Sequence, residues 1–296
     1  MSVKVNSAEA VAATAGNSDK VIEQFAAELL TAIVAGKHRL PPWSPETERL
    51  RRMLATESVK PGQWSKSLAS SPHIVVKIMQ AAGSPLFGRA VRARAELKDA
   101  VAHLGHKGML CLVYASALAQ VRNAPRLQHL RPALVRMAES SANTAAVAWL
   151  VAKENTGLAP DDAMLAGLLH NVGKLCLLAN LEVSSKLYTD RRLQLTLLAS
   201  SHTNVAAALI RQFELPAWLS AAVAAQEQEL HIDPTQPLIN EVLAAAVVAA
   251  RTVEAVDETA AHLAGFARLG LDSDAWRVLL RKVPATANAM RELFSA

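Results

Sequence analysis

The sequence is poor in the residues that build β-structure and tight turns. Aromatic residues make up only 4% of its 296 residues, and it contains only 12 glycines. Neither Asn-Gly nor Asp-Gly occurs, so the strongest short signal of a β-hairpin is missing. Alanine, leucine and valine dominate an apolar content of 51%, and apolar residues recur mostly three and four positions apart. These features predict an all-α chain.

Long apolar runs and a secretion signal are also missing. The longest uninterrupted apolar run, from Val242 to Ala250, is nine residues, whereas a membrane-spanning helix needs about 20. The first residues do not show a charged segment followed by an apolar one. Cys111 and Cys176 lie in apolar helical patterns without CxxC spacing, which predicts buried free thiols. We therefore expect a cytoplasmic protein without a membrane segment.

The positive charge of the chain is modest, with a formal net charge of +5 and a pI near 9.4. Its densest run is a candidate face for phosphates or an acidic partner, and contains Arg89, Arg92, Arg94 and Lys98. Glu96 and Asp99 interleave with this run, as they do on an ordinary solvated helix. Aromatic residues do not alternate with the basic ones, so we do not expect nucleic acid as a partner.

One stretch, residues 161–175, combines helical periodicity with residues that can carry chemistry. Its apolar positions follow the i, i+3, i+4, i+7 pattern of one buried helical stripe, formed by Leu165, Leu168, Leu169 and Val172. His170 lies near the edge of this stripe, from which its ring can reach an internal site. Gly173 allows either a sharp break or a close approach of another helix, and Lys174 follows it.

Residues 167–174 read GLLHNVGK and resemble GLLHDIGK, the signature of the HD superfamily of metal-dependent phosphohydrolases. In that family the His-Asp pair supplies two adjacent metal ligands. Asn171 replaces the aspartate here, and a neutral amide oxygen is a much poorer ligand for a hard divalent ion than a carboxylate. The resemblance therefore implies a metal site, and the substitution implies that this site is damaged.

Three further segments narrow the resemblance to the HDOD domain, the HD-related output domain of bacterial signalling proteins. They are Leu40-Pro41, residues 71–84 and residues 100–105, in the order that this family shows. Ser71 and Gly83 depart from the usual aspartate and asparagine. The resemblance spans roughly residues 38–252 and implies two packed helical lobes. We expect a flexible leader (1–18), an N-terminal lobe (19–125), an HD-like lobe (126–253) and a helical extension (254–296).

The set of metal ligands implied by the resemblance is incomplete. His170 and His202 match two histidines of the family pattern, but the helix before the motif has no histidine at residues 136–144. Residues 225–227 replace a frequent His-His pair, and residues 249–251 replace a late aspartate. We therefore expect neither a metal, a cofactor nor a catalytic residue. His170, Asn171, Lys174 and His202 would line a vestigial pocket, with His170 bonded to Asn171 or to a backbone carbonyl.

Two hypotheses of function follow from the resemblance. The first is a non-catalytic bacterial signalling module that binds other proteins, with a small ligand as a further option. Its implied partners are signalling proteins such as response regulators or cyclic-di-GMP enzymes, supplied by other chains. The second is a phosphohydrolase with an altered metal site, in which Lys174 binds phosphate rather than being solvated. A third, weaker idea is a nucleotide or nucleic-acid sensor that uses the basic run.

Overall fold

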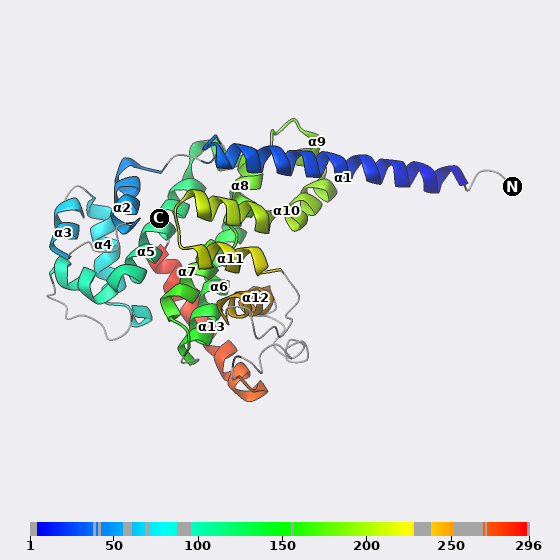
Figure 1. The fold of residues 1–296 in the computed structure, drawn as a ribbon. Coiled ribbons are helices and arrows are strands. Elements are labelled where there is room, and N and C mark those ends of the chain that lie inside the picture. Colours follow the sequence, from blue (N-terminus) through cyan, green and yellow to red (C-terminus); the bar gives the residue numbers. More distant parts are fainter. Residues whose placement is uncertain are drawn as a thin grey trace. The chain divides into compact units, whose positions relative to one another are not determined.

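The structure is a computed structural model. It describes residues 5–37, 40, 43–55, 61–68, 71–87, 96–154, 157–227, 238–251, 269 and 271–294. All regular secondary structure in these residues is helical, with helices α1 to α13 and two short 3-10 helices (Figure 1). Throughout these described ranges no β-strand occurs. The prediction of an all-α chain is confirmed.

The chain divides into two compact units, each built from segments that are distant in sequence. The first unit contains residues 1–40 and 171–220, and the second contains residues 41–170 and 221–296. In the first unit the helices are α1 (Val5–Val34), α8 (Val172–Asn180), α9 (Lys186–Thr189) and α10 (Arg191–Gln212). Helix α11 (Ala217–Ala225) begins in the first unit and ends in the second.

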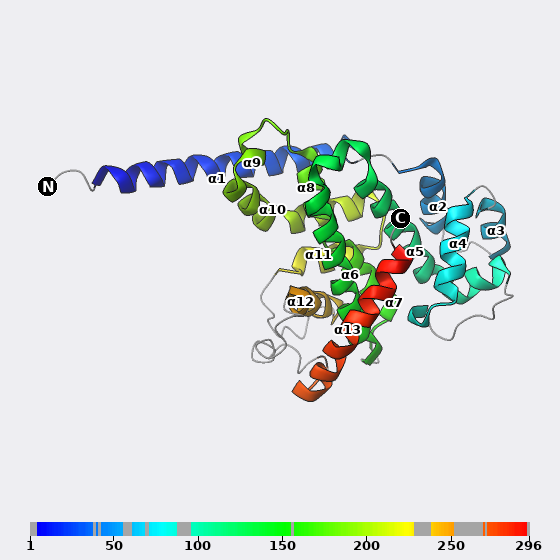
Figure 2. The same cartoon turned by 180° about the vertical axis from the view of Figure 1, so that it is seen from behind.

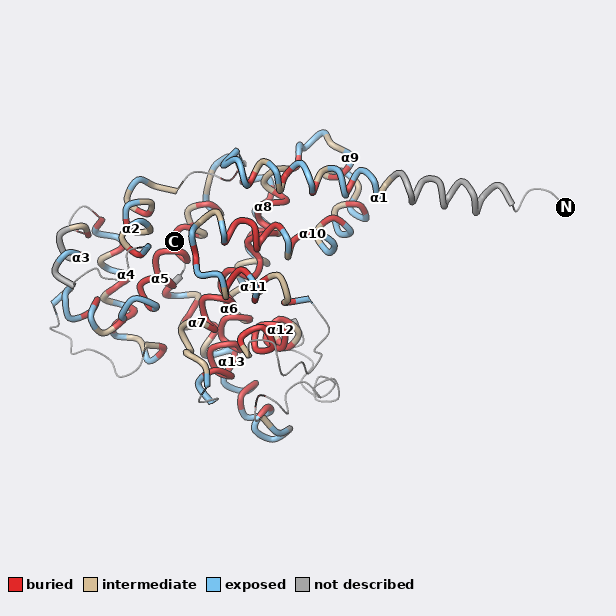
Figure 3. Tube along the Cα trace, viewed as in Figure 1, coloured by how far each residue is buried: buried red, intermediate tan, exposed pale blue. Residues whose placement is uncertain are grey.

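The second unit holds the remaining helices. They are α2 (Pro45–Ala55), α3 (Pro61–Leu68), α4 (Pro72–Ala82), η1 (Pro85–Phe87), α5 (Leu97–Asn123), η2 (Pro125–Leu130), α6 (Arg131–Glu154), α7 (Pro160–Leu169), α12 (Leu238–Arg251) and α13 (Ser273–Phe294). Helix α6 confirms the long helix predicted from about Pro132 to Asn155. It packs against α7, α12 and α13, and α12 is buried over most of its length (Figure 3).

These two units do not coincide with the predicted lobes, which stay a prediction. Residues 19–125 and 126–253 each contribute to both units, and the predicted boundary at residues 125 and 126 lies inside the second unit. The prediction followed chain order, whereas packing joins distant segments: α1 lies against α8 and α10, which follow it by more than a hundred residues. Helix pairing of this kind leaves little trace in a single sequence.

Helix α1 also begins earlier than expected. Its first residue is Val5, inside the predicted leader of residues 1–18. This segment is rich in alanine, the best helix former, which explains the helical backbone. The last helical residue is Val34, and the chain leaves the helix at Gly36, which has a φ of 67°. There the Lys37 amide donates to the Ala32 carbonyl at 2.7 Å and the Gly36 amide donates to the Ile33 carbonyl at 3.0 Å, the pattern of a Schellman cap.

Helix α13 is continuous, although separate helices at residues 274–280 and 285–294 were predicted on either side of Pro284. A proline inside a helix costs about 3 kcal/mol. An apolar residue recurs every three or four positions along α13, and the buried face contains Trp276, Leu279, Leu280, Val283, Ala287, Met290 and Leu293. Burial of this face against α6 and α5 outweighs the proline (Figure 2).

Two segments of the described chain are long and apolar enough to cross a membrane, contrary to the prediction from apolar runs. They are Pro160–Asn180 and Arg191–Gln212, with 83% and 56% of their apolar windows buried inside the protein. A mostly buried core helix passes the same test of length and hydropathy. These two segments are therefore weak evidence for a membrane, and the absence of a membrane contact stays a prediction.

Both cysteines are buried free thiols, as predicted. Burial raises the pKa of Cys176 to about 12 and the pKa of Cys111 well above its usual value. Because the thiolate is the reactive form, we expect 5,5′-dithiobis(2-nitrobenzoate) at pH 8 to leave both thiols unmodified until guanidinium unfolds the protein. Rapid modification of either thiol in the native protein would contradict this burial.

Candidate functional site

Residues 161–175, called the HD-like stretch from here on, belong to two short helices rather than one. Helix α7 ends at Leu169 and α8 begins at Val172, so the break falls at His170 and Asn171, two residues before Gly173. The predicted stripe is buried at all four positions, which confirms it, although Val172 belongs to α8. The backbone leaves the helical region at Asn171, with φ −91° and ψ 1°. This turn sets the direction of the residues that follow it.

Gly173 allows a close approach of two helices, the second of the two roles predicted for it. A Cβ atom added to Gly173 would lie 1.9 Å from the His202 carbonyl oxygen and 2.8 Å from the Ala206 amide nitrogen, both backbone atoms of α10. Only glycine therefore permits this contact. Within the first unit, the contact brings the segment from Asn171 to Lys174 against the turn of α10 that carries His202.

His170 has a structural role that the sequence predicted in part. Its side chain is 2% exposed, and its Nδ1 lies 2.7 Å from the Gly167 carbonyl oxygen. A carbonyl oxygen only accepts, so Nδ1 carries the proton and donates. This bond confirms the predicted alternative of a backbone carbonyl partner. His170 is the last residue of its segment in the second unit, and Asn171 is the first of the next segment in the first unit.

Gln226 supports His170 and was not predicted to do so. Its side chain is 2% exposed, and its Nε2 donates to the His170 carbonyl oxygen at 3.1 Å. Gln226 lies within residues 225–227, which replace the His-His pair of the family pattern. The sequence gives one indication of this role, because Gln226 is a polar residue directly after the apolar helix α11. Gln226 therefore helps to hold the backbone of the HD-like stretch in place.

His202 and Lys174 complete the predicted set. His202 is 1% exposed, and its Nδ1 donates to the Leu198 carbonyl oxygen at 2.7 Å, within its own helix α10. The N-terminus of α10 is capped by Asp190, whose Oδ1 accepts from the Arg192 and Leu193 amides at 2.9 and 3.2 Å. Lys174 is half-buried on α8. The roles proposed for Lys174 stay predictions.

The acidic residues that precede His170 in the same stretch lie at the other end of α7. Asp161 and Asp162 stand in the first turn of α7, where they complement the helix dipole. The Lys107 ammonium group contacts Asp162 Oδ2 at 2.6 Å. Burial raises the pKa of Asp161, the charge of Asp162 raises it further, and Lys107 opposes both. At 1.5 Å per helical residue, these carboxylates lie about 12 Å along the axis from His170, too far to share an ion with it.

The donors do not fit the metal ion that the HD pattern implies. A hard divalent ion needs several oxygen or imidazole ligands, with carboxylates among them. Over the described ranges, no group of three or more histidine, cysteine, aspartate or glutamate residues could hold a metal ion. Asn171 offers an amide at the aspartate position, and His170 and His202 each bond to a carbonyl through Nδ1.

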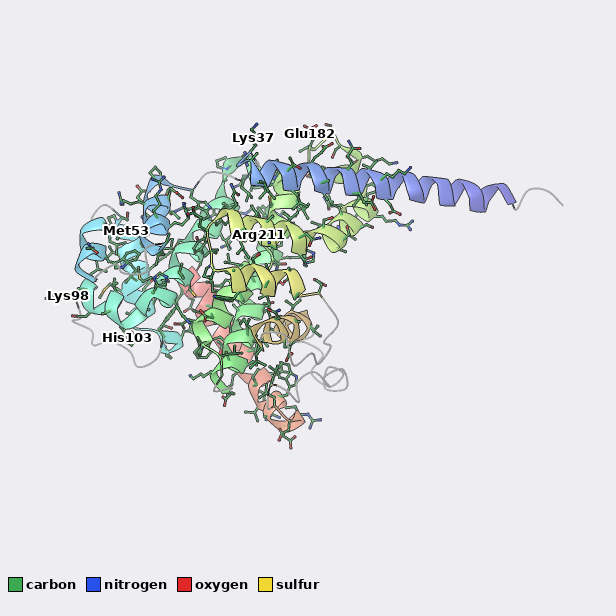
Figure 4. The ribbon with its side chains drawn as sticks, viewed as in Figure 1. Lys37, Met53, Lys98, His103, Glu182 and Arg211 are labelled. Atoms are coloured by element: carbon green, nitrogen blue, oxygen red, sulfur yellow. The ribbon has the colours of Figure 1, made fainter. Side chains whose placement is uncertain are left out.

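The predicted basic face is only partly visible. Arg89, Arg92 and Arg94 lie outside the described residues. Lys98 lies in the first turn of α5 (Figure 4), and its ammonium group contacts Glu96 Oε2 at 2.9 Å. This pair agrees with an ordinary solvated helix. The interaction role of the basic face stays a prediction.

Comparison with known proteins assigns the chain to a family. A family model of the HDOD domain matches residues 40–229, close to the predicted span. A solved structure from Shewanella amazonensis SB2B, described as a "putative metal-dependent phosphohydrolase", superposes with a TM-score of 0.74 at 18% identity. The match covers 92% of this chain and 99% of that one.

Two further solved structures share the fold. An HDOD domain protein of unknown function from Geobacter sulfurreducens has a TM-score of 0.64 at 19% identity, covering 90% of this chain and 97% of that one. A protein from Marinobacter aquaeolei VT8, described as a "putative signal transduction protein", has a TM-score of 0.61 at 18% identity, covering 94% of this chain and 66% of that one. No curated protein matches the chain. The helical fold, the GLLH-x-x-GK stretch and the family match together assign this chain to the HDOD domain family.

Proposed function

We propose that this HDOD protein is a non-catalytic signalling module that acts by binding other proteins. One observation carries the proposal: the HD-like stretch keeps its framework while its ligand chemistry is lost. Gly173 still packs against α10, and Gln226 holds the His170 carbonyl, but Asn171 stands where the family has its aspartate. Packing contacts that are present without a full set of metal ligands favour a structural role of the stretch over a catalytic one.

The partner class follows from the family. The HDOD domain is the HD-related output domain of bacterial signalling proteins, so we propose such proteins as partners, among them response regulators or cyclic-di-GMP enzymes. The structural relative from Marinobacter aquaeolei, whose description names signal transduction, agrees with this context. The two buried free thiols agree with a reducing compartment, and we propose a cytoplasmic location.

A hydrolase assay tests the proposal directly. We expect the protein to hydrolyse p-nitrophenyl phosphate and bis-p-nitrophenyl phosphate, with Mn²⁺ or Mg²⁺ present, no faster than the metal ions alone. The reason is that two imidazoles without a carboxylate neither hold nor orient such an ion well. His170→Gln and His202→Gln, confirmed as folded by circular dichroism, should leave that background rate unchanged.

The alternative function is a metal-dependent phosphohydrolase with an altered site, for which the fold of the Shewanella amazonensis protein is the supporting observation. It predicts a metal-dependent rate well above background that falls in both histidine variants. That result would replace the proposed function. A rate that the two variants leave unchanged would instead indicate a contaminating enzyme.

A further inference from the structure

The second unit contains a cavity that lies outside the candidate site described above. Its volume is about 350 Å³, and its walls come from α5, α6, the end of α7 and α13. Figure 2 shows α13 running across α6 and α5 in this unit. The side chains of His170, Asn171, Lys174 and His202 do not line it. The cavity is therefore separate from the vestigial pocket residues.

Three guanidinium groups line this cavity, those of Arg122, Arg131 and Arg291. Arg291 donates to the side-chain oxygens of Asn143 and Asn288, and Arg131 donates to Gln128 Oε1 at 3.4 Å. These partners are neutral amides, so they orient the two arginines without neutralising them. The positive charge of the wall is left for something else to balance.

Arg122 is the most unusual of the three. It is half-buried at the end of α5, and burial lowers the pKa of its guanidinium group. Within the described part of the chain, neither a carboxylate nor a hydrogen-bond acceptor pairs with it. Burial and then the charge of Arg122 lower the pKa of Lys77, so a second cation lies within electrostatic range. A buried, unpaired guanidinium is costly and normally has a counter-ion.

The acidic contribution to the wall is small. Glu139 is the single acidic residue among the described lining residues, and it is exposed and forms no ion pair with them. The rest of the wall is largely apolar, from Leu118, Leu134, Val135, Ala138, Ala142, Leu168 and Met290. Val135 is 48% exposed, so the cavity reaches solvent on this side. A cationic group set in an apolar wall suits a ligand with both characters.

We propose that this cavity binds a small organic anion, with its carboxylate or phosphate against Arg122 and its apolar part against α6 and α13. A volume of about 350 Å³ is near the lower end of ligand pockets and holds about a dozen water-sized groups. Hexyl phosphate and hexanoate have this size and character. The site stands whether or not the protein acts as a partner-binding module, because no step of the argument uses His170, Asn171, Lys174 or His202.

Titration calorimetry on the full chain tests the proposal with three probes: hexyl phosphate, hexanoate and 1-hexanol. We expect at least one anion to bind with a dissociation constant of about 1 mM or tighter and 1-hexanol to bind at least tenfold more weakly. The stronger of the two anions identifies the charged group. Arg122→Gln should weaken the anion about 10- to 100-fold, because a charge-assisted hydrogen bond is lost.

Two variants serve as controls. Arg136→Gln removes the same charge from an exposed position of α6 outside the cavity, and should leave binding unchanged. Ala138→Leu reduces the cavity without changing its charge, and should weaken every bound anion. Three results would overturn the proposal: no saturable binding of either anion at several millimolar, equal binding of 1-hexanol, or binding unaffected by both Arg122→Gln and Ala138→Leu.

The ligand-free protein gives a test that does not depend on the probe. Arg122→Met replaces a half-buried guanidinium, which has no partner among the described residues, with an apolar side chain of similar length. If Arg122 is kept for a ligand, this change should leave the melting temperature equal or raise it by a few degrees. A clear fall in melting temperature would show that Arg122 stabilises the fold itself and would contradict a ligand-binding role.

Discussion

Gly173→Ala is expected to lower the free energy of unfolding by about 3 kcal/mol or more. The new Cβ atom would lie 1.9 Å from the His202 carbonyl oxygen and 2.8 Å from the Ala206 amide nitrogen. Both are backbone atoms inside α10, so neither can swing aside as a flexible side chain would. Helices α8 and α10 would have to separate, and the apolar contacts between them would loosen.

Urea unfolding followed by circular dichroism measures this effect. Gly83→Ala is the matched control, because its Cβ atom would meet only ordinary contacts at 3.5 and 3.6 Å. Its backbone, with φ −85°, already suits alanine, so we expect a change within about 1 kcal/mol and of stabilising sign. Equal stability of the Gly173→Ala variant and the wild type would mean that α8 and α10 are not in such close contact.

Gly167→Ala is expected to have the second-largest effect, about 2 to 3 kcal/mol, for the same kind of reason in the other unit. Its Cβ atom would lie 2.4 Å from the Ala145 Cα atom and 2.6 Å from the Ala145 amide nitrogen. Gly167 thus allows α7 to lie directly against α6, which also packs against α12 and α13. A Cβ atom would push these two helices apart.

A third glycine extends the comparison into a series. The Cβ atom of Gly108→Ala would meet the Phe87 ring at 3.1 Å and the Leu104 Cβ atom at 3.2 Å. The Phe87 side chain can move, so we expect a smaller loss than for Gly167→Ala. In the same urea titrations the loss of unfolding free energy should decrease from Gly173→Ala through Gly167→Ala to Gly108→Ala. Gly83→Ala should show no loss. A loss for Gly108→Ala that exceeds both helix-contact variants would contradict this steric origin.

The sequence predicted the helical class and much of the helix pattern because each depends on local information. Periodicity predicted the buried stripe formed by Leu165, Leu168, Leu169 and Val172, and Gly36 caps α1 as its positive φ allows. The units were not predicted, because they depend on pairing between segments such as α1 and α10. The helix through Pro284 was not predicted either, since tertiary burial overrides a local preference.

The candidate site shows the same division. The GLLHNVGK stretch identified His170, and both alternatives for its partner came from the chemistry of imidazole. The structure shows the Gly167 carbonyl as a partner of His170, and a turn at Asn171 that the apolar pattern does not predict. Gln226 and Arg122 lie far from the stretch in sequence, and neither residue type matches a ligand of the family pattern. Their importance follows from burial and hydrogen bonding, which only the structure supplies.

The metal content of the untagged protein, measured by elemental mass spectrometry after dialysis, tests the loss of the HD metal site most directly. With Asn171 in place of the aspartate and no three-ligand group among the described residues, iron, manganese, zinc and magnesium should remain at background. Near-stoichiometric metal would mean that His170 and His202 belong to a working ligand set. It would contradict a non-catalytic module and favour the phosphohydrolase.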